Sequence, residues 1–231
     1  ASCAPQPRLD LFQRIIAPEN LLSAWEQLRG RSSVAASGGP EEDRAFFENP
    51  GANLSRLARE LARHQYVPSP YIVFEIDKGG GEQRAISRMR LRDKVVQQAF
   101  RQVVEPYWDA LFCDSSYAYR PAKGAAKAVA RAKHAMVHDG SWALSADIDD
   151  FFDRIDHDIL IQMMAETGLD ARSVDLAALW IRMGGLRHQR YWKDRFAGVP
   201  QGAVISPLLS NLYLNPFDHH MRACKISMVR Y

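Results

Sequence analysis

The 231-residue sequence is poor in cysteine and has no long apolar run. Its three cysteines, Cys3, Cys113 and Cys224, lie far apart and form no CxxC pair, which favours reduced thiols over a disulfide framework. No apolar stretch approaches the roughly 18 residues of a membrane span, and Arg8 and Asp10 interrupt the amino terminus. We therefore expect no signal peptide, no membrane anchor and a cytoplasmic protein.

Two common kinds of site also lack their signatures. The glycine run 79–81 is followed neither by GK[ST] nor by a helix, which excludes a P-loop. His134 and His138 have helical spacing, but no cysteine or HExxH acid accompanies them, so we expect structural or surface roles rather than a zinc site. His157-Asp158 resembles the pair of His-Asp phosphohydrolases, whose other spaced histidines are not evident.

Charge is abundant and strongly segregated. Residues 78–133 hold twelve lysines and arginines against five acids, whereas residues 147–175 hold nine acids against two arginines. Residues 182–195 are basic again, with five cations against one acid. An acidic block between basic ones indicates a cation site flanked by surfaces for a polyanion, although helix faces that pair with each other would give the same pattern.

Strands and helices mix without a regular βαβ repeat, which predicts an α+β fold. Hydrophobic periodicity predicts helices over residues 19–28, 54–64, 91–105, 122–136, 156–166 and 206–221. Alternation and turn residues predict hairpins at 71–87 and 186–196 and a strand at 141–148. Pro106 is expected just past the end of its helix. One apolar stripe is assigned to the core: Leu91, Val95, Ala99, Phe100 and Val103.

The stretch ADIDDFFDRIDHD holds six carboxylates in thirteen positions. Asp156 precedes an apolar helical run and is expected to cap it, and Asp153 is expected in a solvated turn. Asp147 differs, because it ends a largely apolar predicted strand where an unpaired carboxylate is costly. Hard carboxylate oxygens in that setting suit Mg²⁺, which shares its coordination shell with water and substrate phosphates.

Several motifs, in order, resemble those of reverse transcriptases, particularly the group II intron-encoded lineage. ADIDDFFDRIDHD is similar to motif A of that family, and GVPQGAVISPLLSNLYL to motif B. IDKGGGEQRAIS with LRDKVVQQAF resembles the fingers hairpin and its following helix, SYAYRP the next block, and ENLLSAW the amino-terminal extension. The match spans about residues 15–231. Arg84-Ala85 replaces the usual Arg-Pro, and Ala203-Val204 replaces a small residue and proline. SYAYRP and LYLNPFD look closest to CRISPR-associated reverse transcriptases, with intron maturases next.

The resemblance implies a right-hand polymerase in which residues 1–231 form one fingers–palm unit. The fingers would comprise approximately 1–90 and 159–204, and the palm approximately 91–158 and 205–231. The final KISMVRY resembles the strand that leads into motif C, tyrosine-any-Asp-Asp. We therefore expect a C-terminally incomplete chain that is truncated before motif C and has no thumb.

The resemblance also implies roles for particular residues. Asp147 would be catalytic and would bind two Mg²⁺ ions, with the backbone carbonyl of Ile148 as a further ligand. Phe152 would lie under the sugar and exclude a 2′-hydroxyl. The residues implied to bind the nucleotide are Lys78, Arg84, Asp150, Phe151, Phe152, Gln201 and Gly202. Those implied to bind nucleic acid are Tyr119, Arg120, Lys123 and Lys127.

The function that follows is RNA-directed DNA polymerisation by two-metal nucleotidyl transfer in the complete protein. The partners would be an RNA template, a DNA or RNA primer, dNTPs, and further domains or proteins that complete the palm and thumb. We expect this chain alone to be inactive. The alternatives are a non-catalytic, RNA-binding maturase-like scaffold and an RNA-dependent RNA polymerase. Phe152 disfavours the latter, because hand-type RNA polymerases have an acid at that position.

Overall fold

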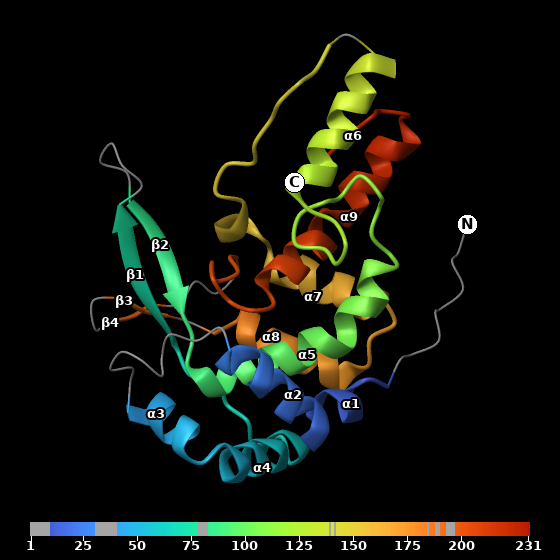
Figure 1. Ribbon diagram of the computed structural model, residues 1–231. Helices are drawn as coiled ribbons and strands as arrows, with labels where there is room; N and C mark the ends of the chain where they lie inside the picture. The colour runs from blue at the N-terminus through green and yellow to red at the C-terminus, as the bar shows by residue number, and fades with distance from the viewer. Residues whose placement is uncertain are drawn as a thin grey trace.

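The computed structural model describes residues 10–30, 41–77, 83–138, 140, 142–183, 185–187, 190–192 and 197–231 (Figure 1). The first elements are helices: α1 (Phe12–Ile16), α2 (Pro18–Arg29), α3 (Glu41–Glu48) and α4 (Pro50–Ala62). The middle of the chain contains β1 (Tyr71–Asp77), β2 (Gln83–Arg88), α5 (Leu91–Asp109), α6 (Ala125–His138) and the 3₁₀ helix η2 (Phe151–Arg154). The remaining elements are α7 (His157–Glu166), α8 (Ala171–Ile181), β3 (Gly185–Arg187), β4 (Arg190–Trp192) and α9 (Ser206–Ala223).

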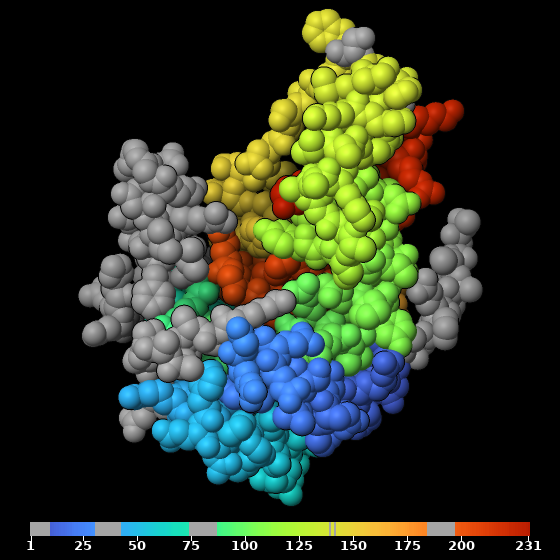
Figure 2. Space-filling view, in the orientation of Figure 1, coloured from blue at the N-terminus to red at the C-terminus, as the bar shows by residue number. Residues whose placement is uncertain are grey.

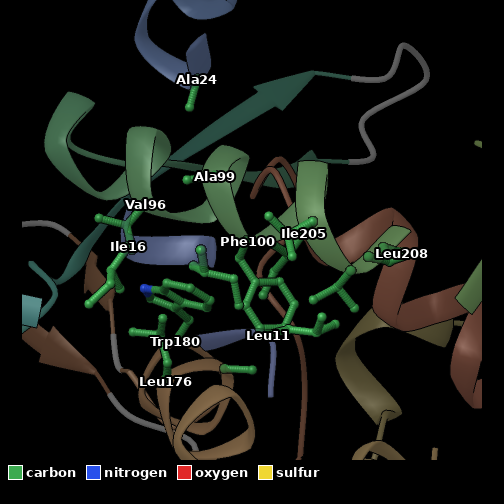
Figure 3. Packing of buried hydrophobic residues seen from close by; sticks show 14 of the residues in the cluster. Leu11, Ile16, Ala24, Val96, Ala99, Phe100, Leu176, Trp180, Ile205 and Leu208 are labelled. Atoms are coloured by element: carbon green, nitrogen blue, oxygen red, sulfur yellow. The ribbon is translucent and has the colours of Figure 1, made fainter. Parts of the chain in front are cut away.

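Helix α5 lies at the centre of the core and packs against α1, α2, α3 and α9. Its predicted stripe is buried throughout, as expected for residues with helical spacing. In Figure 3 the ring of Phe100 faces Trp180 of α8, and the two rings meet edge to face with centroids 5.6 Å apart. The prediction for Pro106 is wrong, because α5 continues through it to Asp109.

The described strands form one four-stranded sheet in the order β2-β1-β3-β4. Strands β1 and β2 are antiparallel, with Ile72 opposite Arg88 and Ile76 opposite Arg84. Strands β3 and β4 are also antiparallel, and β3 lies parallel to β1. Both predicted hairpins are confirmed, and the mixture of this sheet with many helices is the predicted α+β class.

The strand predicted at 141–148 is wrong for the residues that the structure describes there. Residues 142–148 belong to no strand, and all are exposed. Figure 1 shows this yellow segment running alone from α6 down to η2. The exposed fraction is 98% for Trp142 and 93% for Leu144. Alternating side chains alone do not make a strand, because a strand also needs backbone hydrogen bonds to a neighbouring segment. Among the described residues, no segment pairs with this one.

Helix α6 is loosely attached to the rest of the molecule. Among its described residues only Ala128 is buried, and Arg131 reaches Ser227 after α9 with a hydrogen bond of 3.2 Å. His134 and His138 are exposed, and their rings stack with centroids 4.2 Å apart, which agrees with the predicted surface role. Among the described residues, no helix combines the length and apolar character needed to cross a bilayer.

Candidate functional site

The acidic turn begins at Asp147 and ends in η2. Asp150 adopts a left-handed backbone conformation, with φ 49° and ψ 36°, and its carbonyl accepts hydrogen bonds from the N–H groups of Asp153 and Arg154. The guanidinium of Arg154 lies 3.5 Å from a carboxylate oxygen of Asp149 and 3.6 Å from one of Asp150. Within the described part of the chain, Asp147 has no ion pair or hydrogen bond. Its carboxylate is therefore available to a ligand.

The cap predicted for the next helix is confirmed. A carboxylate oxygen of Asp156 accepts a hydrogen bond of 2.9 Å from the N–H of Ile159, which satisfies one of the free donors at the start of α7. Asp153 lies in η2 with an exposed side chain, in agreement with its predicted turn. Between them Ile155 is fully buried and anchors the acidic turn to the core.

Motif B lies directly against this turn. The N–H of Val199 donates to the carbonyl of Phe152, and the N–H of Gly198 donates to the carbonyl of Ile155, both at 2.8 Å. Next to them, Asp156 and Ala197 form an antiparallel bridge. Two stretches that are more than 40 residues apart in sequence are thus held together by backbone hydrogen bonds, which no side-chain substitution removes directly.

The two phenylalanines of motif A attach the acidic turn to the hydrophobic core. Phe151 and Phe152 are half-buried and pack on the main core. Their rings meet edge to face at 5.5 Å, and Phe151 also lies 6.3 Å from the ring of Tyr213 in α9. Phe152 is therefore fixed at two places: its ring contacts the core and its carbonyl binds Val199.

The loop at Gln201 and Gly202 joins motif B to the sheet. The carbonyl of Gln201 accepts a hydrogen bond of 2.9 Å from the N–H of Ser87 in β2. Gly202 is exposed and has φ 99°, a conformation that favours glycine. Arg84 lies in β2 opposite Ile76, and the structure describes its backbone position only. Lys78 lies outside the described residues.

Arg120, which was predicted to contact nucleic acid, is largely enclosed by the protein. Its side chain is 6% exposed, and its guanidinium binds the carboxylate of Asp109 at 2.6 Å. It also donates to the carbonyl oxygens of Asp109, Cys113 and Ser116 at 2.7–3.1 Å. Four of its five N–H donors are thus occupied, so Arg120 braces the loop after α5, and its contact with nucleic acid stays a prediction.

The other three residues predicted to bind nucleic acid lie nearer the surface. Tyr119 and Lys127 are exposed, and Lys123 is half-buried. Both lysines donate to backbone carbonyls, Lys123 to Asp114 and Lys127 to Ala122. Tyr119 has a left-handed φ of 57°. Contact of these three side chains with nucleic acid stays a prediction.

The sequence reasoning missed a buried charge pair that joins the last residues to the loop after α5. The guanidinium of Arg230 binds both carboxylate oxygens of Asp218 at 2.6 and 2.8 Å, and Asp218 is fully buried. Arg230 also donates to Asn211 at 3.0 Å and to Ser116 at 2.8 Å. A signal was present, because Asn211 and Asp218 are polar positions on the apolar stripe of α9, where a buried polar group needs a partner.

Backbone hydrogen bonds reinforce that pair. The N–H of Arg230 donates to the carbonyl of Ser115, and the carbonyl of Arg230 accepts from the N–H of Tyr117, both at 2.8 Å. Figure 1 shows the carboxyl terminus beside this green loop.

Figure 2 shows the face hollowed below the yellow acidic segment, with orange atoms of the chain after residue 197 exposed in the hollow. Motif A and motif B therefore share one concave surface.

The donors at Asp147 fit a magnesium ion in kind but not in number. The exposed carboxylate of Asp147 and the carbonyl of Ile148 are hard oxygen ligands of the type that Mg²⁺ prefers. In the part of the chain that the structure describes, however, no three His, Cys, Asp or Glu side chains come together in a way that would hold a metal ion. The described residues alone do not make a complete metal site.

Residues 76–231 match the family model described as reverse transcriptase (RNA-dependent DNA polymerase). Protein YkfC of Escherichia coli is 33% identical over 172 residues, which are 73% of this chain and 45% of that protein. The group II intron-encoded protein LtrA of Lactococcus lactis is 25% identical over 95% of this chain and 36% of its own length. The chain thus spans less than half of either relative.

A chain of the solved partial Cas6-RT-Cas1–Cas2 complex shares this fold. Its TM-score is 0.58 with 24% sequence identity, and the match covers 92% of this chain and 35% of that one. The predicted α+β polymerase architecture is therefore the observed fold. Together with the family match over residues 76–231, it establishes that the chain belongs to the reverse transcriptase (RNA-dependent DNA polymerase) family.

Proposed function

We propose that this chain provides the fingers and palm of an RNA-directed DNA polymerase. The fingers would comprise approximately residues 1–90 and 159–204, and the palm approximately 91–158 and 205–231. The observation that carries the proposal is the set of backbone hydrogen bonds between motif A and motif B. It supports a site in which Asp147, Phe152 and Gln201 face the same nucleotide.

Each of these residues suits a part of the reaction. The carboxylate of Asp147 and the carbonyl of Ile148 would hold two Mg²⁺ ions once the whole protein supplies further ligands. When bound, such ions activate a primer hydroxyl and stabilise the leaving pyrophosphate. Phe152, with its fixed backbone, would exclude a 2′-hydroxyl by its bulk. Gly202 has no side chain and would let the backbone approach the nucleotide closely.

The remaining partners follow from the same proposal. Arg84 and Lys78 would bind the triphosphate, and the backbone N–H of Asp150 would contact it. The template would be RNA and the primer DNA or RNA, along the surface that includes Tyr119 and Lys123. The similarity to the group II intron-encoded protein LtrA and to a chain of the Cas6-RT-Cas1–Cas2 complex supports an intron-encoded or CRISPR-associated branch in which further domains or proteins complete the enzyme. We propose a cytoplasmic location.

A second candidate is a non-catalytic, maturase-like scaffold that binds RNA. The observation that favours it is the incomplete set of metal ligands among the described residues. A scaffold would need the basic surface but not the carboxylate of Asp147. The two candidates therefore differ in what this one side chain does.

The test is Asp147→Ala in the whole protein, with Asp158→Ala as the control. Asp158 belongs to the same acidic stretch, but its side chain is 85% exposed and pairs with Arg182. We expect Asp147→Ala to abolish template-primed dNTP incorporation and leave RNA binding intact, whereas Asp158→Ala stays close to wild type. If Asp147→Ala keeps more than a few per cent of wild-type incorporation, or if the wild type only binds RNA, the polymerase proposal fails.

A further inference from the structure

His157, the first residue of α7, is buried at the junction of motifs A and B. The residue is only 2% exposed, and its Nε2 lies 2.7 Å from the carbonyl oxygen of Gly198. A carbonyl oxygen only accepts, so Nε2 is the nitrogen that carries the proton and donates. Nδ1 is also buried and has no hydrogen-bond partner among the described residues. The imidazole thus makes one directed hydrogen bond, and that bond is to the motif B backbone.

The hydrogen bond from His157 continues the backbone contacts described above. Gly198 donates to Ile155 and accepts from His157, while the next residue, Val199, donates to Phe152. Gly198 therefore has both its backbone groups bound to motif A.

The two backbones also approach each other closely at this point. Gly198 has φ 95°, and a Cβ added to it would lie 3.3 Å from the carbonyl oxygen of Asp153. The direction in which the chain leaves Gly198 toward Gln201 and Gly202 thus depends on what holds the Gly198 carbonyl.

We propose that His157 is a positioning residue for nucleotide selection. It acts through Gly198, because its hydrogen bond fixes the gap between the ring of Phe152 on one side and the Gln201–Gly202 loop on the other. This inference rests on the polymerase function proposed above. Loss of the hydrogen bond leaves a partly buried carbonyl unsatisfied, which is costly, so the loop shifts to find another donor. A wider gap then binds dNTPs less well and tolerates a 2′-hydroxyl.

A core histidine that only fills space would have a different signature. His157→Leu keeps much of the volume and removes the donor. In His157→Gln the side-chain amide occupies the position of Nε2 and can still donate to Gly198, whereas in His157→Asn the same amide is one methylene too short. A packing role predicts that Leu is tolerated best, and the positioning role predicts that Gln is.

The experiment measures steady-state incorporation of dNTPs and rNTPs by the whole protein on a primed RNA template, for the wild type and these three variants. Thermal unfolding of each variant is recorded in parallel. We expect His157→Leu and His157→Asn to raise the KM for dNTPs and to lower the preference for dNTPs over rNTPs by roughly tenfold, as the loss of one partly buried hydrogen bond implies. His157→Gln should keep both values close to wild type.

The outcomes separate the two proposals. If His157→Leu and His157→Asn incorporate nucleotides with the KM and sugar preference of the wild type, the inference about His157 fails while the polymerase function stands. The same holds if the Gln variant is as impaired as the Asn variant, since Gln restores the donor. If His157→Leu does not fold, the comparison of Gln with Asn decides by itself. Absence of incorporation by the wild type overturns the polymerase function, and the inference with it.

Discussion

Arg120 and Lys123 lie three residues apart in one basic stretch, but their surroundings differ. The guanidinium of Arg120 is enclosed by Asp109 and by carbonyl oxygens, and is 6% exposed. The ammonium group of Lys123 lies near the surface beside the exposed carboxylate of Asp114. The sequence shows only that both are cations. Which of them is available to a phosphate depends on the carbonyl groups that the loop after α5 turns inward, and this is a property of its tertiary path.

Phe152 is the residue for which selectivity is most directly testable. Phe152→Ala and Phe152→Val remove the ring and open space below the sugar, so we expect incorporation of rNTPs relative to dNTPs to rise roughly tenfold or more in the whole protein. Primer extension with each nucleotide type measures it. Phe152→Tyr keeps the ring and serves as the control. An unchanged preference in the Ala and Val variants would assign the sugar selectivity to another residue.

Asp93 is the residue for which pH should matter. It lies buried in the first turn of α5, and burial raises the pKa of its carboxyl. Hydrogen bonds from Tyr66 at 2.7 Å and from the N–H of Ser69 at 3.0 Å oppose that rise in the pKa without cancelling it. The folded state thus binds this proton more tightly than the unfolded chain does.

The sign of the pH effect follows from linkage. The stability that the protonated form contributes is fully present below the unfolded pKa of about 3.9 and is lost as pH rises through the raised folded pKa. We expect the free energy of unfolding of the wild type, relative to Asp93→Asn, to fall as pH rises from about 4 toward neutrality. Urea unfolding at several pH values measures it. A relative gain for the wild type over that range would contradict the assignment.

Elements that carry their own start and stop signals were predictable. The sequence that forms β1 and β2 alternates on either side of the glycine run 79–81, and α7 begins at an aspartate cap. The stretch 142–148 was not predictable in this way, because a strand requires a partner and the pattern of one segment does not reveal it. Helix α5 passes through Pro106 because, within the last turn, packing of its core face outweighs the missing hydrogen bond.

The candidate site also has features that the sequence predicts and features that it does not. The residue types of motif A and motif B indicated the chemistry, but nothing in either motif indicates that the N–H of Val199 binds the carbonyl of Phe152. Nor does the position of His157 in the sequence indicate that its ring reaches Gly198. Backbone contacts between distant segments leave no residue-type signature, so the three-dimensional structure is needed to find them.

The attachment of α9 to the final residues gives a stability prediction. Asp218→Ala leaves the guanidinium of Arg230, whose side chain is 14% exposed, without its carboxylate partner. We expect the free energy of unfolding to fall by about 3 to 5 kcal/mol, as when one member of a buried ion pair is removed. Urea unfolding measures it.

The control for this pair is the double variant Asp218→Ala with Arg230→Met. It removes both charges, so it should be less destabilised than the sum of the two single variants. Additive single effects, or a loss below about 1 kcal/mol for Asp218→Ala, would mean that the pair is not coupled as its geometry implies.

For the molecule as a whole, we expect the 231-residue chain by itself to be inactive as a polymerase. The described residues gather no three acidic or histidine side chains around Asp147 that would hold a metal ion, and two-metal transfer needs such ligands. Purified chain, a primed RNA template, dNTPs and Mg²⁺ should give no incorporation above background. Incorporation that Asp147→Ala abolishes would show that the chain is sufficient.

The hydrogen bond between Arg230 and Ser116 also has a consequence for synthesis on the ribosome. The two residues are 114 positions apart. At 5 to 20 residues per second, the loop after α5 therefore waits roughly 6 to 23 s after leaving the peptidyl transferase centre before the arginine that closes it is made. Asp218, the buried partner of Arg230, is itself made only 12 residues earlier, near the end of that interval. A nascent chain paused after Ser116 and before Arg230 should expose the loop to proteases and recruit chaperones until translation resumes.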